Sequence, residues 1–377
     1  MKTGYPSFLK NGSKHLAIAG GGTGGHIFPA LAIAKAVMNM RPEIKLTYLG
    51  KATGPEARLA RQNDIRFYDI PARPLARKLS LSNLMIPFTL WRGSSRTVKL
   101  IRKEGIGALI GTGGYVSVPA LMGAKRAKIA IFLQEQNSYP GIATRLYAKH
   151  ASRLFIASSK AKKYLSAESS FHQVGNPLRS DFKLLSREDG LDYFDLSPDK
   201  RTLLVFGGSQ GAQALNDKIA ENLPFLAKQG NLQMIWQAGK NNFNIYRHAF
   251  EASGIQGVVL EFIERMDLAY ASADLAFCRS GALSLAELAA CGLPAILVPY
   301  PWAAEDHQYH NAKEYADSGA AVVVKQPELA GFDLVRTVGD LLFDRAKLEQ
   351  MKKAAVSMAD LEAADKIAAE IIEVMKW

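Results

Sequence analysis

Short apolar, β-branched runs alternate along the chain with longer segments of helical composition. Runs of this kind are typical of strands buried in parallel sheets, and the segments between them are long enough for crossover helices. The expected strands are residues 14–19, 44–49, 65–70, 108–111, 129–133, 153–157, 202–206, 233–237, 258–262, 274–277, 295–298 and 321–324. The alternation predicts an α/β fold with doubly wound parallel sheets.

Two halves of the chain open in the same way, with a strand, a glycine-rich turn and a helix. The first reads LAIAGGGTGGHIFPALA and the second LLVFGGSQGAQALN. This predicts two Rossmann-like domains, residues 1–176 and 177–377, which would face each other across a cleft. Residues 345–375 have the composition of helices, and the last helix is a candidate to pack back on the N-terminal domain.

The composition narrows the class of protein. With 377 residues, 48% of them hydrophobic and 22% charged, the chain has a globular composition. Two cysteines, Cys278 and Cys291, fit neither a disulfide framework nor a zinc pattern. A secretory signal and a transmembrane helix are both unexpected, because the chain lacks the apolar runs that they require.

The net charge of +12 is unevenly distributed. Residues 1–176 carry +20, whereas residues 177–377 carry −8. A basic half of this size indicates an anionic partner, which could be nucleic acid, anionic lipid or a phosphorylated substrate.

Residues 73–103 form the densest basic stretch, and none of them is acidic. Basic side chains around a bulky apolar block are typical of a surface that binds an anionic membrane, although a solvated helix face over ordinary core has the same pattern. Nucleic acid is not expected, because no recognition motif accompanies the charge. The candidate membrane residues are Leu84, Met85, Ile86, Phe88, Trp91, Arg92 and Arg96.

Three glycine-rich loops follow predicted strands, at residues 20–26, 111–115 and 207–211. Such loops let backbone N–H groups approach an anion at a helix start. The first loop satisfies G-x-G-x-x-G, but the second strand ends Leu49-Gly50-Lys51, without the carboxylate of a nicotinamide site. An oxidoreductase is therefore the weaker alternative, and two phosphorylated ligands, one per half, are expected.

The segment from Cys278 to Glu314 offers groups for a nucleotide sugar. Glu287, in an expected helix over 282–290, could accept hydrogen bonds from a ribose diol, and Arg279 could meet a diphosphate. The alternatives are a solvated helix residue and a partner of a surface carboxylate. Gln308 and Asn311 lie three residues apart and suit sugar hydroxyls, whereas a metal site at His307 and His310 is the weaker interpretation.

Taken together and in order, the motifs resemble a known family. They are GGGTGGHIFPALA, GTGGYVSVPAL, EQN, VGNPLR, FGGSQGAQALN, EFIERM, CRSGALSLAELAACGLPAILVPYP and DHQYHNA. The set resembles the lipid I N-acetylglucosaminyltransferases of glycosyltransferase family 28, which act in bacterial peptidoglycan synthesis.

This resemblance implies a glycosyltransferase-B fold and a hexosyltransferase without a cofactor. The implied reaction is inverting transfer from UDP-N-acetylglucosamine to the 4-hydroxyl of the N-acetylmuramoyl unit of lipid I, giving lipid II and UDP. It also implies a peripheral location on the cytoplasmic face of the inner membrane, a role in cell wall biogenesis, cell shape and division, and other cell-wall synthesis proteins as candidate partners. A related enzyme with another lipid acceptor is the alternative.

The resemblance also implies site residues. For the donor they are Thr23, Gly24, Gly25, Asn137, Arg179, Ser209, Ile263, Arg279, Ala282, Leu283, Ser284, Leu285, Ala286, Glu287, Gln308 and Asn311. For the acceptor diphosphate they are Gly22, Gly113, Gly114 and Tyr115.

The catalytic base has two candidates. His26 is favoured because it follows the first loop at a helix start, where the dipole favours the neutral imidazole. Glu135 of EQN is the rival, and a histidine that only shapes the loop is the third interpretation. No D-x-D motif occurs in the chain, so no metal site is expected.

Overall fold

The computed structural model describes residues 13–74, 84–208 and 211–377. The chain divides into two compact units. The N-unit comprises Met1–Ser180 and Asp360–Trp377, and the C-unit comprises Asp181–Ala359. The first segment of the N-unit therefore ends four residues after the boundary that the sequence predicted at residue 176. The last helix also belongs to the N-unit.

Seven parallel strands form the sheet of the N-unit in the order β3-β2-β1-β4-β5-β6-β7. All but the last were expected from the sequence. β7 is a three-residue edge strand with two polar residues, too short for a recognisable apolar run. The strands are β1 (His15–Gly20), β2 (Lys45–Gly50), β3 (Arg66–Asp69), β4 (Ala108–Gly113), β5 (Ala130–Glu135), β6 (Arg153–Ile156) and β7 (Phe171–Gln173).

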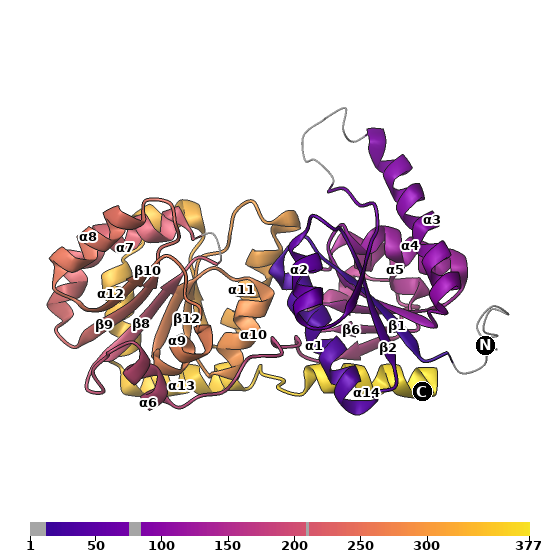
Figure 1. The fold of residues 1–377 in the computed structure, drawn as a ribbon. Helices are drawn as coiled ribbons and strands as arrows, with labels where there is room; N and C mark the ends of the chain where they lie inside the picture. The colour runs from indigo at the N-terminus through magenta and orange to yellow at the C-terminus, as the bar shows by residue number, and fades with distance from the viewer. Residues whose placement is uncertain (1–12, 75–83, 209–210) are drawn as a thin grey trace. The chain divides into compact units, whose positions relative to one another are not determined.

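Helices cover both faces of this sheet (Figure 1). Alternate residues of β1 face opposite cores: Leu16 and Ile18 pack with α1 and α14, whereas Ala17 and Ala19 pack with α3 and α4. Strands that are buried on both faces are characteristic of doubly wound sheets. The helices are α1 (Gly24–Met40), α2 (Pro55–Gln62), α3 (Ile86–Glu104), α4 (Ser117–Ala127), α5 (Ile142–Tyr147) and α14 (Ala363–Met375).

The last helix, α14, lies beside α1, although the two are far apart in the sequence (Figure 1). Its apolar residues, Ile367, Ile371 and Ile372, enter the core around α1. On the polar side of α14, Glu370 Oε1 accepts a hydrogen bond from Arg153 Nε at 2.6 Å, and Glu370 Oε2 lies 2.8 Å from His172 Nδ1. The final helix is therefore held to the N-unit by both apolar packing and an ion pair.

The C-unit repeats this architecture with six parallel strands in the order β10-β9-β8-β11-β12-β13. These are β8 (Arg201–Phe206), β9 (Leu232–Gln237), β10 (Gln256–Leu260), β11 (Leu275–Cys278), β12 (Ala295–Leu297) and β13 (Ala321–Val323). The helices are α6 (Arg187–Tyr193), α7 (Gln213–Leu226), α8 (Phe243–Ser253), α9 (Met266–Ser272), α10 (Ala282–Ala290), α11 (His307–Asp317), α12 (Leu334–Leu342) and α13 (Arg345–Val356).

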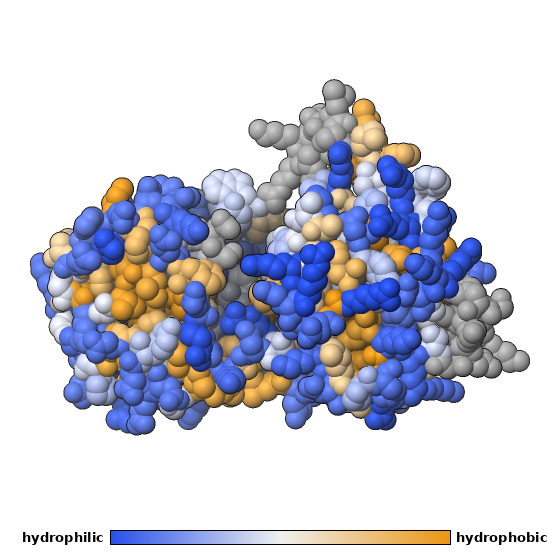
Figure 2. Space-filling view, viewed as in Figure 1, coloured by the Kyte–Doolittle hydropathy of each residue, from blue (hydrophilic) through white to orange (hydrophobic). Residues whose placement is uncertain are grey.

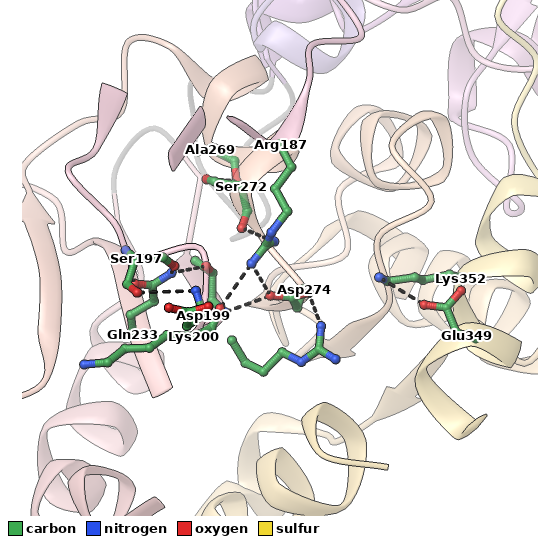
Figure 3. Close-up of polar contacts among 12 residues, drawn as sticks. Arg187, Ser197, Asp199, Lys200, Gln233, Ala269, Ser272, Asp274, Glu349 and Lys352 are labelled. Atoms are coloured by element: carbon green, nitrogen blue, oxygen red, sulfur yellow. Dashed lines mark hydrogen bonds and ion pairs between the residues drawn. The ribbon is translucent and has the colours of Figure 1, made fainter. Parts of the chain in front are cut away.

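A buried charge cluster ties together the amino ends of β8 and β11. Asp274, only 2% exposed, accepts hydrogen bonds from the Thr202 backbone N–H and from Arg201, and it pairs with Arg187 at 3.0 Å. Figure 3 shows Arg187 bridging Asp274 and Ser272. Because ligands of such sheets bind at the carboxyl ends of the strands, this cluster at the opposite edge is structural.

Candidate functional site

The two glycine loops of the N-unit lie where the strand order reverses, after the neighbouring strands β1 and β4. Such a switch point is the usual ligand site of a doubly wound sheet. Gly22, Gly113 and Gly114 have positive φ angles of 87°, 103° and 77°. A Cβ on Gly114 would lie 2.1 Å from the carbonyl oxygen of Gly21, so only glycine lets the two loops approach this closely.

His26 lies in the first turn of α1 and is half-buried. Its Nδ1 is 3.1 Å from the carbonyl oxygen of Thr112 and 3.1 Å from Oε1 of Gln136. Thr112 in turn donates through Oγ1 to the carbonyl of His26 at 2.7 Å. The imidazole is therefore contacted from the carboxyl ends of two neighbouring strands, β4 and β5.

Glu135, the rival candidate base, ends β5 and is only 3% exposed. It accepts hydrogen bonds from both nitrogens of Asn137 at 3.1 Å, from the Gly141 backbone N–H at 3.0 Å and from the Thr144 hydroxyl at 2.5 Å. Four donors occupy the lone pairs of both oxygens. These contacts favour an anchor of the loop after β5 over a proton acceptor.

A carboxylate that the sequence analysis missed lies under the first glycine loop. Glu56 of α2 is fully buried and accepts hydrogen bonds from the backbone N–H groups of Lys51 and Gly22 at 3.1 and 3.4 Å. A Cβ on Gly21 or Gly54 would lie within 3 Å of this carboxyl group. The sequence signal for it is a glutamate in the first turn of the helix after β2, five residues beyond Lys51.

The remaining N-unit candidates surround the same edge. Thr23 precedes α1, while Gly24 and Gly25 form its first turn. The ring of Tyr115 lies against Gly22, at 3.0 Å from a Cβ built there. The guanidinium of Arg179 lies 5.7 Å from the centre of the Phe28 ring. The structure therefore brings most of the N-unit candidates to the ends of β1, β4 and β5.

In the C-unit, the third glycine loop follows β8, next to β11 at the second switch point. Ser209 lies outside the described residues. Gln237, buried at the end of β9, donates to the carbonyl of Gly208 at 2.8 Å and accepts the backbone N–H of Ile263 at 2.9 Å. A side chain not foreseen from the sequence therefore links this loop to the segment of Ile263.

Arg279, directly after β11, is buried and only 9% exposed. Its guanidinium donates to the carbonyls of Val298 and Pro299 and to Gln326 Oε1, at 3.0, 3.1 and 2.6 Å. Burial lowers the pKa of Arg279 to about 10. It contacts no carboxylate within the part of the chain that the structure describes, so it is not the surface ion-pair partner considered above.

The helix expected over 282–290 is α10, and its first turn holds Ala282, Leu283 and Ser284, followed by Leu285 and Ala286. Glu287 is 5% exposed and accepts a hydrogen bond from the Tyr270 hydroxyl at 2.9 Å. A solvated role for Glu287 is therefore wrong.

The start of α11 contacts the turn after β11 and the segment after β12. Gln308 accepts the backbone N–H of Tyr300 at 3.0 Å, and its carbonyl accepts the Ser280 hydroxyl at 2.8 Å. Asn311, one turn later, is 5% exposed. Glu305 and Asp306 before the helix have left-handed φ angles of 54°, a costly conformation that often accompanies functional loops.

The amino-terminal part of α3 exposes a basic and apolar surface (Figure 2). Leu84, Phe88 and Trp91 are 75%, 49% and 56% exposed. The rings of Phe88 and Trp91 stack 6.3 Å apart, and the guanidinium of Arg92 lies 5.6 Å from Phe88. Met85 is also exposed, Ile86 is half-buried, and Arg96 pairs with Asp69 at 3.6 Å while remaining half-exposed. We call these residues the α3 surface.

Across residues 13–74, 84–208 and 211–377, no three Asp, Glu, His or Cys side chains are grouped as a metal site would require. None of the helices in these ranges has the length and hydropathy needed to cross a membrane.

Comparison with known proteins gives consistent matches across both units. Residues 16–156 match the glycosyltransferase family 28 N-terminal domain, and residues 202–370 match the C-terminal domain of the same family. The UDP-N-acetylglucosamine–N-acetylmuramyl-(pentapeptide) pyrophosphoryl-undecaprenol N-acetylglucosamine transferase of Chlorobaculum tepidum is 39% identical, with 95% of this chain and 98% of the relative covered.

The enzyme of the same name from Desulforamulus reducens is 35% identical, with 92% of this chain and 95% of the relative covered. The crystal structure of Acinetobacter baumannii MurG is similar with a TM-score of 0.76 and 29% identity, over 96% of this chain and 99% of that one.

Proposed function

The chain belongs to glycosyltransferase family 28, and we infer that it transfers N-acetylglucosamine from UDP-N-acetylglucosamine to lipid I, giving lipid II and UDP. The observation that carries this conclusion is the likeness over nearly the full length of both chains to transferases named for this reaction. The direct test is transfer of labelled N-acetylglucosamine to a lipid I analogue.

The N-unit holds the acceptor in this proposal. Gly22, Gly113, Gly114 and Tyr115 line the carboxyl edge at the β1/β4 switch point, where backbone N–H groups and the start of α1 favour an anion. In this proposal the anion that binds there is the diphosphate of the acceptor. Glu56 holds the first loop in its shape from below.

His26 is the general base. Its Nε2 removes the proton of the acceptor 4-hydroxyl while that oxygen forms a bond to the anomeric carbon of the donor. The bond from the anomeric carbon to UDP breaks on the opposite face, which inverts the configuration. The Thr112 carbonyl and Gln136 Oε1 both face Nδ1 and stabilise the imidazolium that forms. Glu135 anchors the neighbouring loop.

The C-unit holds the donor. Arg279 is a buried cation whose described contacts are carbonyl and amide oxygens, so the negative charge that would balance it is supplied by the diphosphate of the donor. The amino end of α10, with Ala282, Leu283 and Ser284, adds its dipole to the departing UDP.

Glu287 accepts hydrogen bonds from the ribose hydroxyls, oriented by Tyr270. Gln308 and Asn311 bind hydroxyls of the transferred sugar from the start of α11. From the family resemblance we also assign to the donor Ser209, Ile263, Leu285 and Ala286 of the C-unit and Thr23, Gly24, Gly25, Asn137 and Arg179 of the N-unit.

The α3 surface binds the anionic cytoplasmic face of the inner membrane, where the acceptor lies. Three exposed apolar side chains with arginines beside them provide both the apolar area and the positive charge that peripheral binding requires. Phe88 and Trp91 enter the interface, and Arg92 and Arg96 remain at the level of the lipid headgroups.

A further inference from the structure

We propose that Gln136 is a positioning residue that fixes the tautomer of His26, with the proton on Nδ1 and the lone pair on Nε2. The proposal rests on the proposed function, in which His26 is the base. Gln136 is the middle residue of EQN, directly after β5, and it is only 5% exposed. Two further amides, Gln134 and Asn176, determine which way its side chain points.

The orientation starts from a backbone carbonyl. The carbonyl oxygen of Gln136 can only accept a hydrogen bond, so the atom of Asn176 that lies 3.0 Å from it is the amide nitrogen Nδ2. Oδ1 of Asn176 is then the acceptor on its other side. This Oδ1 accepts a hydrogen bond from Nε2 of Gln134 at 3.2 Å. The direction of the Gln134 amide is thereby set as well.

The same logic continues to Gln136. Oε1 of Gln134 faces Gln136 as an acceptor, so Gln136 presents Nε2 to it. That nitrogen also donates to the carbonyl oxygen of Thr112 at 2.7 Å. A rotated amide would direct Oε1 of Gln136 at two oxygens. Oε1 consequently faces Nδ1 of His26, 3.1 Å away.

His26 Nδ1 therefore meets two acceptors, Gln136 Oε1 and the Thr112 carbonyl, each at 3.1 Å. Only a protonated Nδ1 can satisfy them, and in a neutral imidazole this leaves the lone pair on Nε2. The opposite tautomer would place a lone pair against two buried oxygens. The arrangement selects the tautomer in which Nε2 can take a proton.

Burial and close packing keep the hydrogen bonds that select this tautomer of His26. Gln134 is 1% exposed and Thr112 is fully buried, so water has no ready access to replace the side-chain amide. A Cβ on Gly113 would lie 2.7 Å from Nδ1, which shows how closely the ring rests on the second glycine loop. The ring is thus positioned by the loop, and its proton is positioned by the amides.

The experiment uses the full-length protein with ¹⁵N-labelled histidine, in wild type and in Gln136→Leu. The ¹⁵N shifts of the imidazole report which nitrogen carries the proton, and the His26→Asn variant assigns the signals. A matched control is Gln233→Leu in the C-unit. Gln233 is also a fully buried glutamine, bonded to Ser197 and Thr202 and labelled in Figure 3.

We expect the Nδ1–H form in the wild type and in the control. In Gln136→Leu we expect a measurable share of the Nε2–H form, a kcat lower by about 10- to 100-fold and little change in KM for the donor. A wild-type spectrum with the proton on Nε2 would overturn the proposal, and so would a Gln136→Leu protein whose tautomer and kcat match the wild type. The tautomer measurement needs no substrate, so its failure is distinguishable from failure of the transfer assay.

Discussion

The hydroxyl of Tyr270 donates a hydrogen bond to Oε2 of Glu287 over 2.9 Å, linking α9 to α10 inside the C-unit. Tyr270 is 2% exposed, and burial together with the neighbouring carboxylate raises its pKa well above the usual value. The phenol therefore remains a donor at any working pH, and it fixes the direction of a carboxylate that the proposal assigns to the ribose.

Replacing Glu287 should weaken donor binding. Hydrogen bonds to a charged group contribute ~1.5–3 kcal/mol each, so Glu287→Gln should raise the Kd for UDP by about 10-fold or more. Titration calorimetry with UDP measures this directly. The control is Glu349→Gln on α13, whose side chain is 55% exposed. Equal affinities in the two variants would exclude Glu287 from the nucleotide site.

His26→Ala should lower kcat without changing UDP affinity. Loss of a general base typically reduces turnover by about 10²- to 10⁴-fold. His248→Ala is the matched control, because the side chain of His248 is 72% exposed on the C-unit. Steady-state kinetics on a soluble acceptor over a range of pH separates the roles. Near-normal turnover with an unchanged pH profile would show that His26 only shapes the loop.

Glu135→Gln should behave as a stability variant. Four donors surround the carboxylate, and the substitution replaces one acceptor oxygen with an NH2 group that faces these donors. We expect the free energy of unfolding to fall by ~1–3 kcal/mol. Urea denaturation measures the loss, and the pH dependence of kcat in the folded variant should keep its wild-type limbs. A variant of full stability whose acid limb has disappeared would restore Glu135 as the base.

Charge reversal on the α3 surface should release the protein from anionic vesicles. Each basic residue near such a surface contributes ~1 kcal/mol. Glutamate at Arg92 and Arg96, and at Lys99, which is also exposed on α3, should together reduce binding by ~100-fold or more. Vesicle sedimentation at low and high salt measures it, and UDP affinity should be unchanged. The matched control reverses three exposed basic residues of the C-unit, Arg336, Lys347 and Lys353. Vesicle binding that survives the α3 reversal would disprove the membrane assignment.

Stability should fall as the pH drops below neutrality because of His15. This residue is 5% exposed, contacts Thr47 Oγ1 and the Glu104 carbonyl, and has a pKa lowered by burial. As the pH falls through ~6.5, the ordinary pKa of histidine, His15 takes up a proton in the unfolded chain but not in the folded chain. Denaturation of His15→Gln should therefore show a smaller loss of stability than wild type between about pH 7.5 and 5.5. A loss of the same size in both proteins would place the effect elsewhere.

Much of the fold could be predicted from the sequence because strands buried on both faces leave continuous apolar runs. β7 could not, since its three residues pair only along one edge. The strand expected over 258–262 is β10, which begins two residues earlier, at Gln256. The sequence did not predict this start, because Gly257 lies inside the strand with a φ of 136° and a glycine usually indicates a turn.

Only those parts of the site that follow from local sequence patterns could be predicted. Glycine loops and the helix of Glu287 are local patterns, and they could be located before the structure. The contacts of Glu56 and Gln136 join residues 34 and 110 positions apart, so no local pattern reveals them. The same is true of Glu370, which meets Arg153 across 217 positions and holds α14 to the N-unit.

The most direct test of the central claim is transfer of labelled N-acetylglucosamine from the UDP-linked donor to a short-chain lipid I analogue, with diacylglycerol as the competing acceptor. The account predicts a product with the mobility of a lipid II analogue, release of UDP in equal amount and no labelled diacylglycerol. Labelled diacylglycerol without a lipid II product, or no transfer to either acceptor by the folded protein, would contradict it.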